Sequence, residues 1–190
     1  MSAAAGGAAA PALALRPIEP ADRPFLLSLY ASTRERELAA VPFTPAQRAA
    51  FLAQQFDAQS RHYAQYPDTT FDVVLVDGEP AGRLLVGRWP RELRIVDVAL
   101  LPPFRGRGIG TRLLAPLLAE ADAGGLPLTI HVERGNPAQR LYRRLGFAPV
   151  AEVAAGVYQR WERPAGGAGP AAGAGPAGAG PAGAAPAGVS

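Results

Sequence analysis

The stretch LLPPFRGRGIGTRLL, residues 100–114, places alternating glycines and several arginines directly before a segment with the apolar spacing of a helix. Glycine lets a backbone curl and approach a ligand closely, and the first N–H groups of a helix have no acceptor within it. These N–H groups and the helix dipole favour a bound anion. We therefore predict a phosphate-binding loop formed by Arg105, Gly106, Arg107, Gly108, Ile109, Gly110, Thr111 and Arg112.

Two familiar phosphate-binding loops do not fit this stretch. A Walker A loop contains Gly-Lys-Ser or Gly-Lys-Thr, but all 19 basic residues of the chain are arginine. A dinucleotide fingerprint has the spacing Gly-x-Gly-x-x-Gly early in a βαβ unit, whereas Gly106, Gly108 and Gly110 alternate and stand late in the chain. The loop therefore belongs to another class of phosphate site.

The hydrophobic pattern predicts the elements that position this loop. Residues 92–101 are nearly all apolar, which is typical of a central strand, and they lead directly into the loop. Residues 108–123 have helical periodicity, and residues 127–133 form the next strand. A second helix follows, with Asn136 as its N-cap and Pro137 at its first position.

The rest of the chain completes a mixed sheet. Two helices fill the region between residues 22 and 63, and Thr44 with Gln47 predicts a capping box at the start of the second. The remaining predicted strands cover residues 13–18, 71–89 (a hairpin that turns at Asp77-Gly78), 148–153 and 157–161. The predicted fold class is α/β, more exactly an α+β mixed sheet with helices on both faces.

Both ends of the chain have a composition that cannot form a core. Residues 1–12 are mostly Ala and Gly, and residues 163–190 are mostly Pro, Ala and Gly. Such segments bury too little apolar surface to offset the entropy of ordering them. We therefore predict a disordered extension at each end and a single folded domain over residues 13–162.

Composition also excludes several classes of function. The chain has no cysteine, which excludes disulfides, thiolate catalysis and cysteine-based metal sites. No signal peptide and no membrane-spanning run is evident, so we expect a cytoplasmic protein without a membrane partner. The net charge is +3, but no basic run with interleaved aromatic residues indicates a nucleic-acid partner.

Two segments resemble motifs of a known enzyme family. RIVDVALLPPFRGRGIGTRLL (residues 94–114) resembles motif A of the GNAT N-acetyltransferases, and NPAQRLYRRLGF (residues 136–147) resembles motif B. The resemblance implies the GNAT acyl-CoA acyltransferase fold, acetyl-CoA as cosubstrate and no metal. It also implies direct acetyl transfer, in a ternary complex, to a primary amine of a small molecule or protein. A monomer or a homodimer would fit this expectation.

The resemblance assigns roles to particular residues. The main chain of Val98, Ala99 and Leu100 would hold the pantetheine arm of acetyl-CoA, and an N–H near Leu100 would polarise the thioester carbonyl. Asn136 would contact the cofactor arm, although an Asn before Pro is also a good helix cap. Tyr142 would assist the departing thiol, and the alternative is a residue that only packs in the core.

The general base follows less directly from the motifs. One branch of the family has a Glu where this chain has Arg94, and counting back from Asn136 places another branch's Glu at His131. His131 is therefore the predicted base, with Asp97, Glu133 and a water relay as alternatives. The charged run from Arg34 to Glu37 contacts the acceptor or is a solvated helix face. A CoA-binding module without catalysis is the alternative function.

Overall fold

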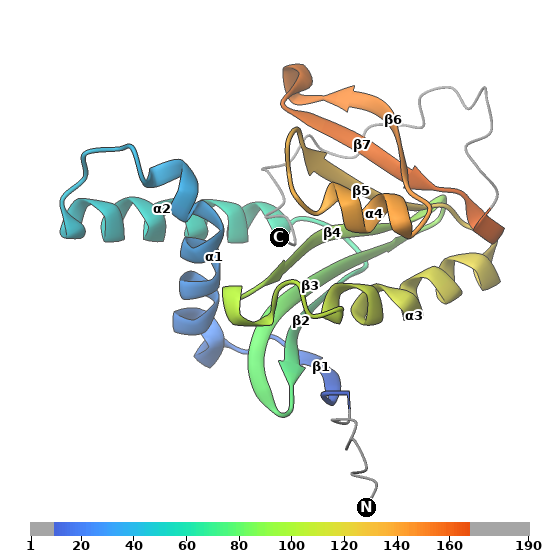
Figure 1. Cartoon of the computed structure of the whole chain (residues 1–190), viewed down its shortest axis with the longest axis horizontal. Coiled ribbons are helices and arrows are strands. Elements are labelled where there is room, and N and C mark those ends of the chain that lie inside the picture. Colours follow the sequence, from blue (N-terminus) through green and yellow to red (C-terminus); the bar gives the residue numbers. More distant parts are fainter. Residues whose placement is uncertain (1–9, 168–190) are drawn as a thin grey trace, which may run out of the picture.

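Within residues 10–167, which the computed structural model describes, seven strands form one sheet in the order β1-β2-β3-β4-β5-β7-β6 (Figure 1). Only β4 and β5 are parallel, and the other neighbouring pairs are antiparallel. The predicted mixed sheet is confirmed. The strands are β1 (Leu13–Pro17), β2 (Thr69–Val76), β3 (Glu79–Trp89), β4 (Glu92–Leu100), β5 (Leu128–Glu133), β6 (Ala148–Val153) and β7 (Tyr158–Arg163).

Helices cover both faces of this sheet, as predicted. They are α1 (Arg23–Leu38), α2 (Pro45–Tyr63), α3 (Ile109–Gly124) and α4 (Gln139–Arg144). The side chains of Val98 and Leu100 belong to the main core cluster, with residues of α3 and α4, whereas Ala99 packs with residues of α1 and α2. Strand β4 is therefore buried from both sides, which explains why its sequence is apolar almost throughout.

Local sequence signals explain two of the junctions. The Thr44 side chain accepts a hydrogen bond from the Gln47 main-chain N–H (3.3 Å), and the Gln47 side chain accepts one from the Thr44 N–H (2.9 Å), which confirms the capping box. Asp77 and Gly78 have φ angles of +52° and +85°, as a two-residue hairpin turn requires.

The beginning of α4 differs from the prediction. This helix starts at Gln139, so Asn136 is not its N-cap. The Asn136 Oδ1 instead accepts the Ala138 N–H (2.8 Å), and the Gln139 N–H donates to the Asn136 carbonyl (3.1 Å). These short-range bonds close a tight turn before the helix, and Asn136 caps that turn.

Hydrogen bonding continues slightly beyond residues 13 and 162, the bounds of the predicted domain. The Ala12 N–H donates to Asp77 (2.8 Å), and the Gly166 N–H donates to Asp122 (2.6 Å). The rest of the two predicted extensions, residues 1–9 and 168–190, lies outside the described residues. None of the helices between residues 10 and 167 is long and apolar enough to cross a membrane.

Candidate active site

The parallel strands β4 and β5 separate halfway along their length. Their pairing comprises Leu93 with Leu128, Arg94 with Thr129, and Ile95 with Ile130. Beyond these pairs β4 continues to Leu100 and β5 to Glu133, and Figure 1 shows the two strands running apart. Among the described residues, the edge of β4 that faces β5 has no strand partner from Val96 onward.

A bulge in β4 lies at the point where the strands part. Leu85 pairs with Asp97 and the next residue of β3, Val86, pairs with Ile95, so Val96 is an extra residue in β4. Such a bulge bends its strand and increases the local twist. Asp97 is fully buried and forms an ion pair with the buried Arg83. The bulge is therefore anchored on the face that α2 covers.

Anchoring of the bulge extends to α2 itself. The Arg83 Nη2 donates to Oε1 of the buried Gln59 (2.7 Å), and the guanidinium lies 5.8 Å from the centre of the Tyr63 ring. Buried charges are tolerated when they are paired and hydrogen-bonded. Contacts from β3 and α2 thus hold the backbone of β4 where it leaves β5.

Hydrogen bonding to β3 decides which main-chain groups of β4 face the opening. The Leu101 N–H donates to the Ala81 carbonyl (2.8 Å), so alternation along the strand directs the N–H and C=O of Ala99 toward β3 as well. The N–H and C=O of Val98 and Leu100 consequently face the opening between β4 and β5. Of the three predicted residues, these two have main-chain groups in position to hold a ligand.

The glycine-rich loop has the conformation that its sequence predicts. Gly106 and Gly108 have φ angles of +70° and +77°, in the left-handed region that glycine tolerates best. Gly108 is the N-cap of α3, and the first helical N–H with an acceptor is that of Arg112, which donates to the Gly108 carbonyl (3.2 Å). Within the described chain, the N–H groups of residues 106–111 have no protein acceptor. They form a cradle for an anion at the start of α3.

The loop contains one arginine that makes internal hydrogen bonds and two arginines that are exposed. The Arg105 Nε donates to the Leu100 carbonyl (2.8 Å), and its Nη2 donates to the Ser32 hydroxyl on α1 (3.2 Å). Burial lowers the pKa of this guanidinium. Ile109 and Gly110 are buried under the loop, whereas the other loop side chains are exposed: Arg107, Thr111 and Arg112. The Arg105 side chain thus connects the loop to β4 and α1, whereas the side chains of Arg107 and Arg112 remain accessible to a ligand from solvent.

Tyr142 and Asn136 lie on the α4 side of the opening. The Tyr142 ring is 1% exposed, with its centre 5.8 Å from that of Phe147 and 6.5 Å from that of Trp161. Its hydroxyl oxygen is buried, and it shares the core cluster with Val98 of β4. The Asn136 Oδ1 is engaged in its own turn, so its amide group is the part available to donate to a ligand.

Leu128, Ile130 and Val132 of β5 belong to the core that α3 and α4 cover. Because side chains alternate along a strand, His131 and Glu133 lie on the other face of β5. Burial and the positive charges of Arg94 and Arg160 lower the pKa of His131 to about 4. His131 is therefore neutral at pH 7. Burial, and to a smaller extent the charge of Glu133 at the end of β5, raise the pKa of Tyr158.

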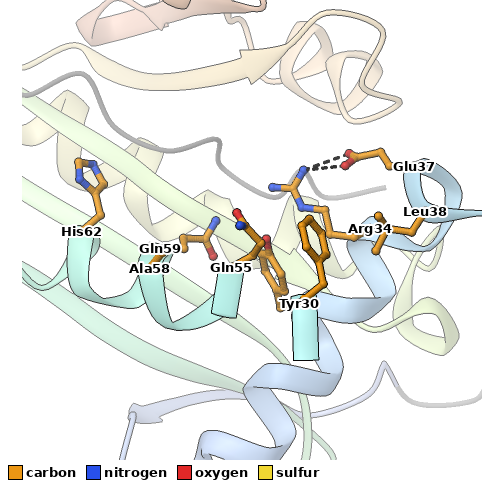
Figure 2. A pocket seen from close by; sticks show the side chains of 9 residues that line it. Tyr30, Arg34, Glu37, Leu38, Gln55, Ala58, Gln59 and His62 are labelled. Carbon is orange, nitrogen blue, oxygen red and sulfur yellow. Dashed lines mark hydrogen bonds and ion pairs between the residues drawn. The ribbon is translucent and has the colours of Figure 1, made fainter. Parts of the chain in front are cut away.

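A cavity of about 430 Å³ lies between α1 and α2, on the His131 side of the sheet (Figure 2). It is lined by Tyr30, Arg34, Glu37, Leu38, Phe51, Gln55, Ala58, Gln59 and His62. Two members of the charged run on α1 thus line a cavity, while Glu35 and Arg36 are exposed elsewhere. The polar lining contributed by α2 was not predicted, although positions 55, 59 and 62 share one helix face by their spacing.

A mixed sheet whose parallel strands separate beside a glycine-rich helix start defines the acyl-CoA acyltransferase fold. The sequence model of the Acetyltransferase (GNAT) family matches residues 34–147, more than half of the chain, and the chain belongs to this family. The resemblance predicted from the two motifs is confirmed.

Solved structures and a curated relative agree with this assignment. The PaiA N-acetyltransferase from Thermoplasma acidophilum, solved in complex with coenzyme A, matches with a TM-score of 0.60 at 14% identity over 80% of this chain and 99% of that one. An acetyltransferase from Thermus thermophilus matches with a TM-score of 0.56 at 21% identity, over 80% and 96%. At these identities the likeness shows the fold. Streptothricin acetyltransferase from Streptomyces lavendulae is 38% identical over 101 residues, which span 50% of this chain and 49% of that enzyme.

Proposed function

We propose that the protein transfers an acetyl group from acetyl-CoA to a primary amine by direct transfer in a ternary complex. One observation carries this proposal: the unpaired edge of β4 lies directly before a cradle of unpaired N–H groups at the start of α3. If the pantetheine arm of acetyl-CoA lies along the unpaired edge of β4, its pyrophosphate reaches the N–H groups at the start of α3. Family membership and the coenzyme A complex of the Thermoplasma structure support the same ligand.

The loop would bind the pyrophosphate of acetyl-CoA. The N–H groups of residues 106–111 would donate to the phosphate oxygens, and exposed Arg107 and Arg112 would add positive charge. The amide group of Asn136 would donate to the pantetheine arm. No metal is required for this binding.

The chemical step needs one hydrogen-bond donor for the thioester and two proton transfers. The amine nitrogen attacks the thioester carbon, the new C–N bond forms, and the C–S bond breaks. The Leu100 N–H, which faces the opening, would stabilise the negative charge on the carbonyl oxygen. The Tyr142 hydroxyl would give its proton to the departing thiolate, which leaves as the free thiol of CoA, and the tyrosinate would regain a proton from water before the next turnover.

His131 would receive the proton that the amine loses. Because its pKa is about 4, the imidazole is neutral and able to accept a proton, but it holds that proton weakly. We therefore assign His131 as a relay that passes the proton on to solvent. Glu133, further along the same face of β5, is the alternative recipient.

The test is release of free thiol from acetyl-CoA with a panel of primary amines that includes streptothricin. We expect turnover with at least one amine, and a kcat about 100-fold lower for Tyr142→Phe at unchanged acetyl-CoA KM. The substitution keeps the buried ring, so thermal unfolding serves as the control for folding. Full activity of Tyr142→Phe would contradict its assignment as the acid. CoA binding without turnover on any amine would favour a binding module instead.

A further inference from the structure

Arg34 presents a shielded positive charge to the cavity between α1 and α2. Its side chain is 17% exposed, and its guanidinium lies 5.4 Å from the centre of the Tyr30 ring. Burial alone would lower the pKa of Arg34, but the charge and hydrogen bond of Glu37, together with the interactions with Tyr30 and Tyr158, outweigh burial and raise the pKa. The cavity therefore contains a permanent cation on an aromatic wall.

Glu37 neutralises only one corner of this guanidinium. Both Glu37 carboxylate oxygens accept from Nη1, at 3.0 and 3.2 Å. The opposite edge of Arg34, formed by Nε and Nη2, has no acceptor among residues 10–167, and Nε is buried. Leaving a buried donor without an acceptor is unfavourable, so this edge is suited to a ligand that supplies acceptors. Two parallel N–H groups of this kind match the two oxygens of a carboxylate.

The unfilled edge is on the side of the cavity. In Figure 2, Glu37 approaches the guanidinium of Arg34 from one side, and Gln55 and Gln59 of α2 lie on the other. The exposed amide of Gln55 offers a further donor on that side. A volume of about 430 Å³ is within the range of sites for small molecules.

The cavity also lies near the proposed reaction centre. Arg34 and Tyr30 interact electrostatically with Tyr158 of β7, and Tyr158 interacts with Glu133 at the end of β5. A molecule bound at Arg34 can thus extend toward the end of β5 and the opening beside β4. Its bound group and its reacting amine would lie at opposite ends.

We propose that the acceptor is a small amine that also carries a carboxylate, and that Arg34 binds this carboxylate through Nε and Nη2. This inference rests on the proposed acetyl transfer. Arg34 is then a specificity-determining residue, and the reacting amine is the group remote from it.

Binding can be measured independently of turnover. The probes are glycine, β-alanine, γ-aminobutyrate and ε-aminocaproate, each compared with its own carboxamide by titration calorimetry in the presence of CoA. For the best chain length we expect the acid to bind at least about tenfold more tightly than the amide, as a charge-assisted bidentate contact provides. That chain length reports the separation between Arg34 and the amine site.

Variants of α1 provide the controls. Arg34→Gln removes the preference for the acid, and Arg34→Lys, which keeps the charge without the two-donor edge, reduces it. Arg36→Gln, a change to an exposed arginine of the same helix, leaves it intact. Equal binding of acids and amides, no binding of either, or an unchanged preference in Arg34→Gln would overturn the inference.

Turnover separates this inference from the proposed function. Arg34-dependent binding of acids without acetylation of any amine would refute acetyl transfer and leave the carboxylate site standing. Acetylation of the amides as efficiently as the acids would support acetyl transfer and refute the carboxylate site.

Discussion

Replacement of Gly108 by alanine tests whether the curled loop binds acetyl-CoA. Gly108 caps α3 with φ +77° and ψ −3°, and a Cβ built there meets no heavy atom within 4 Å. Space therefore does not oppose the substitution, and only the backbone conformation does. A left-handed conformation costs an L-residue about 1–2 kcal/mol.

The effect of this strain depends on whether the loop keeps its conformation. If the loop keeps its shape, Gly108→Ala lowers the free energy of unfolding by about 1–2 kcal/mol. If the loop relaxes toward negative φ, N–H groups turn away from the phosphate, and each lost charge-assisted hydrogen bond is worth about 1.5–3 kcal/mol. Relaxation is favoured because the loop is exposed. We therefore expect the KM for acetyl-CoA to rise about 10- to 100-fold, with a smaller change in kcat.

Gly78→Ala is the matched control. Gly78 lies in the β2–β3 turn with φ +85°, and a Cβ there also meets nothing within 4 Å. The two variants introduce similar strain, but only Gly108 belongs to the proposed site. Steady-state kinetics with varied acetyl-CoA, and thermal unfolding of both variants, provide the comparison. Equal acetyl-CoA KM values for Gly108→Ala and Gly78→Ala would refute the assignment of the loop.

Three further predictions concern the strands beside the opening. Gly82→Ala places a Cβ in a severe clash with the Ala99 carbonyl oxygen, a main-chain atom that cannot move aside alone. We therefore expect the free energy of unfolding to fall by more than about 3 kcal/mol in chemical unfolding, and a loss no larger than that of an ordinary surface substitution would contradict this. Asp97→Asn leaves the buried charge of Arg83 without its counter-ion and should cost about 3–5 kcal/mol, whereas Asp97→Leu combined with Arg83→Met should recover much of that loss. The native pKa of His131, about 4, lies below its ordinary 6.5, so the unfolded state binds the proton more strongly and stability should rise with pH between about 4 and 6.5. His131→Asn should flatten that rise by about 1–3 kcal/mol in unfolding curves measured across this range, and an unchanged pH profile would show that the imidazole is not shielded.

Signals carried by a few neighbouring residues were sufficient for much of the fold. The capping box of Thr44 and Gln47, the Asp77-Gly78 turn and the glycines of the phosphate loop each act within a few residues, and the structure shows all three. The mixed sheet followed from the change of hydrophobic period along the chain. These features could be predicted because their causes lie in contiguous sequence.

The opening between β4 and β5 has a different origin. It begins beside the extra residue Val96, which is defined only by the register between β4 and β3. A strand that is buried on both faces is apolar throughout, so its sequence has no alternation in which a bulge would appear. The family resemblance placed the pantetheine arm along Val98, Ala99 and Leu100, but the residue pattern alone did not predict where the two strands separate.

The direction in which a side chain points could not be predicted from the sequence either. Arg105 has the type and place of a phosphate ligand, yet its guanidinium contacts the Leu100 carbonyl and Ser32. The sequence does not mark Gln55 and Gln59 as lining a cavity, because that cavity forms only where α1 packs against α2. Such positions depend on residues that are distant in the chain.

Gln59 takes part in two structural features, because it lines the cavity between α1 and α2 and also contacts Arg83. This cavity is the one that we propose binds the acceptor, and the contact with Arg83 completes the anchor that fixes the bulge of β4. Engineering of acceptor preference should therefore begin at Arg34 or Gln55, whose contacts leave that anchor intact. Changes at Gln59 would alter acceptor choice and thioester placement together, so this position limits how independently the two substrates can be retuned.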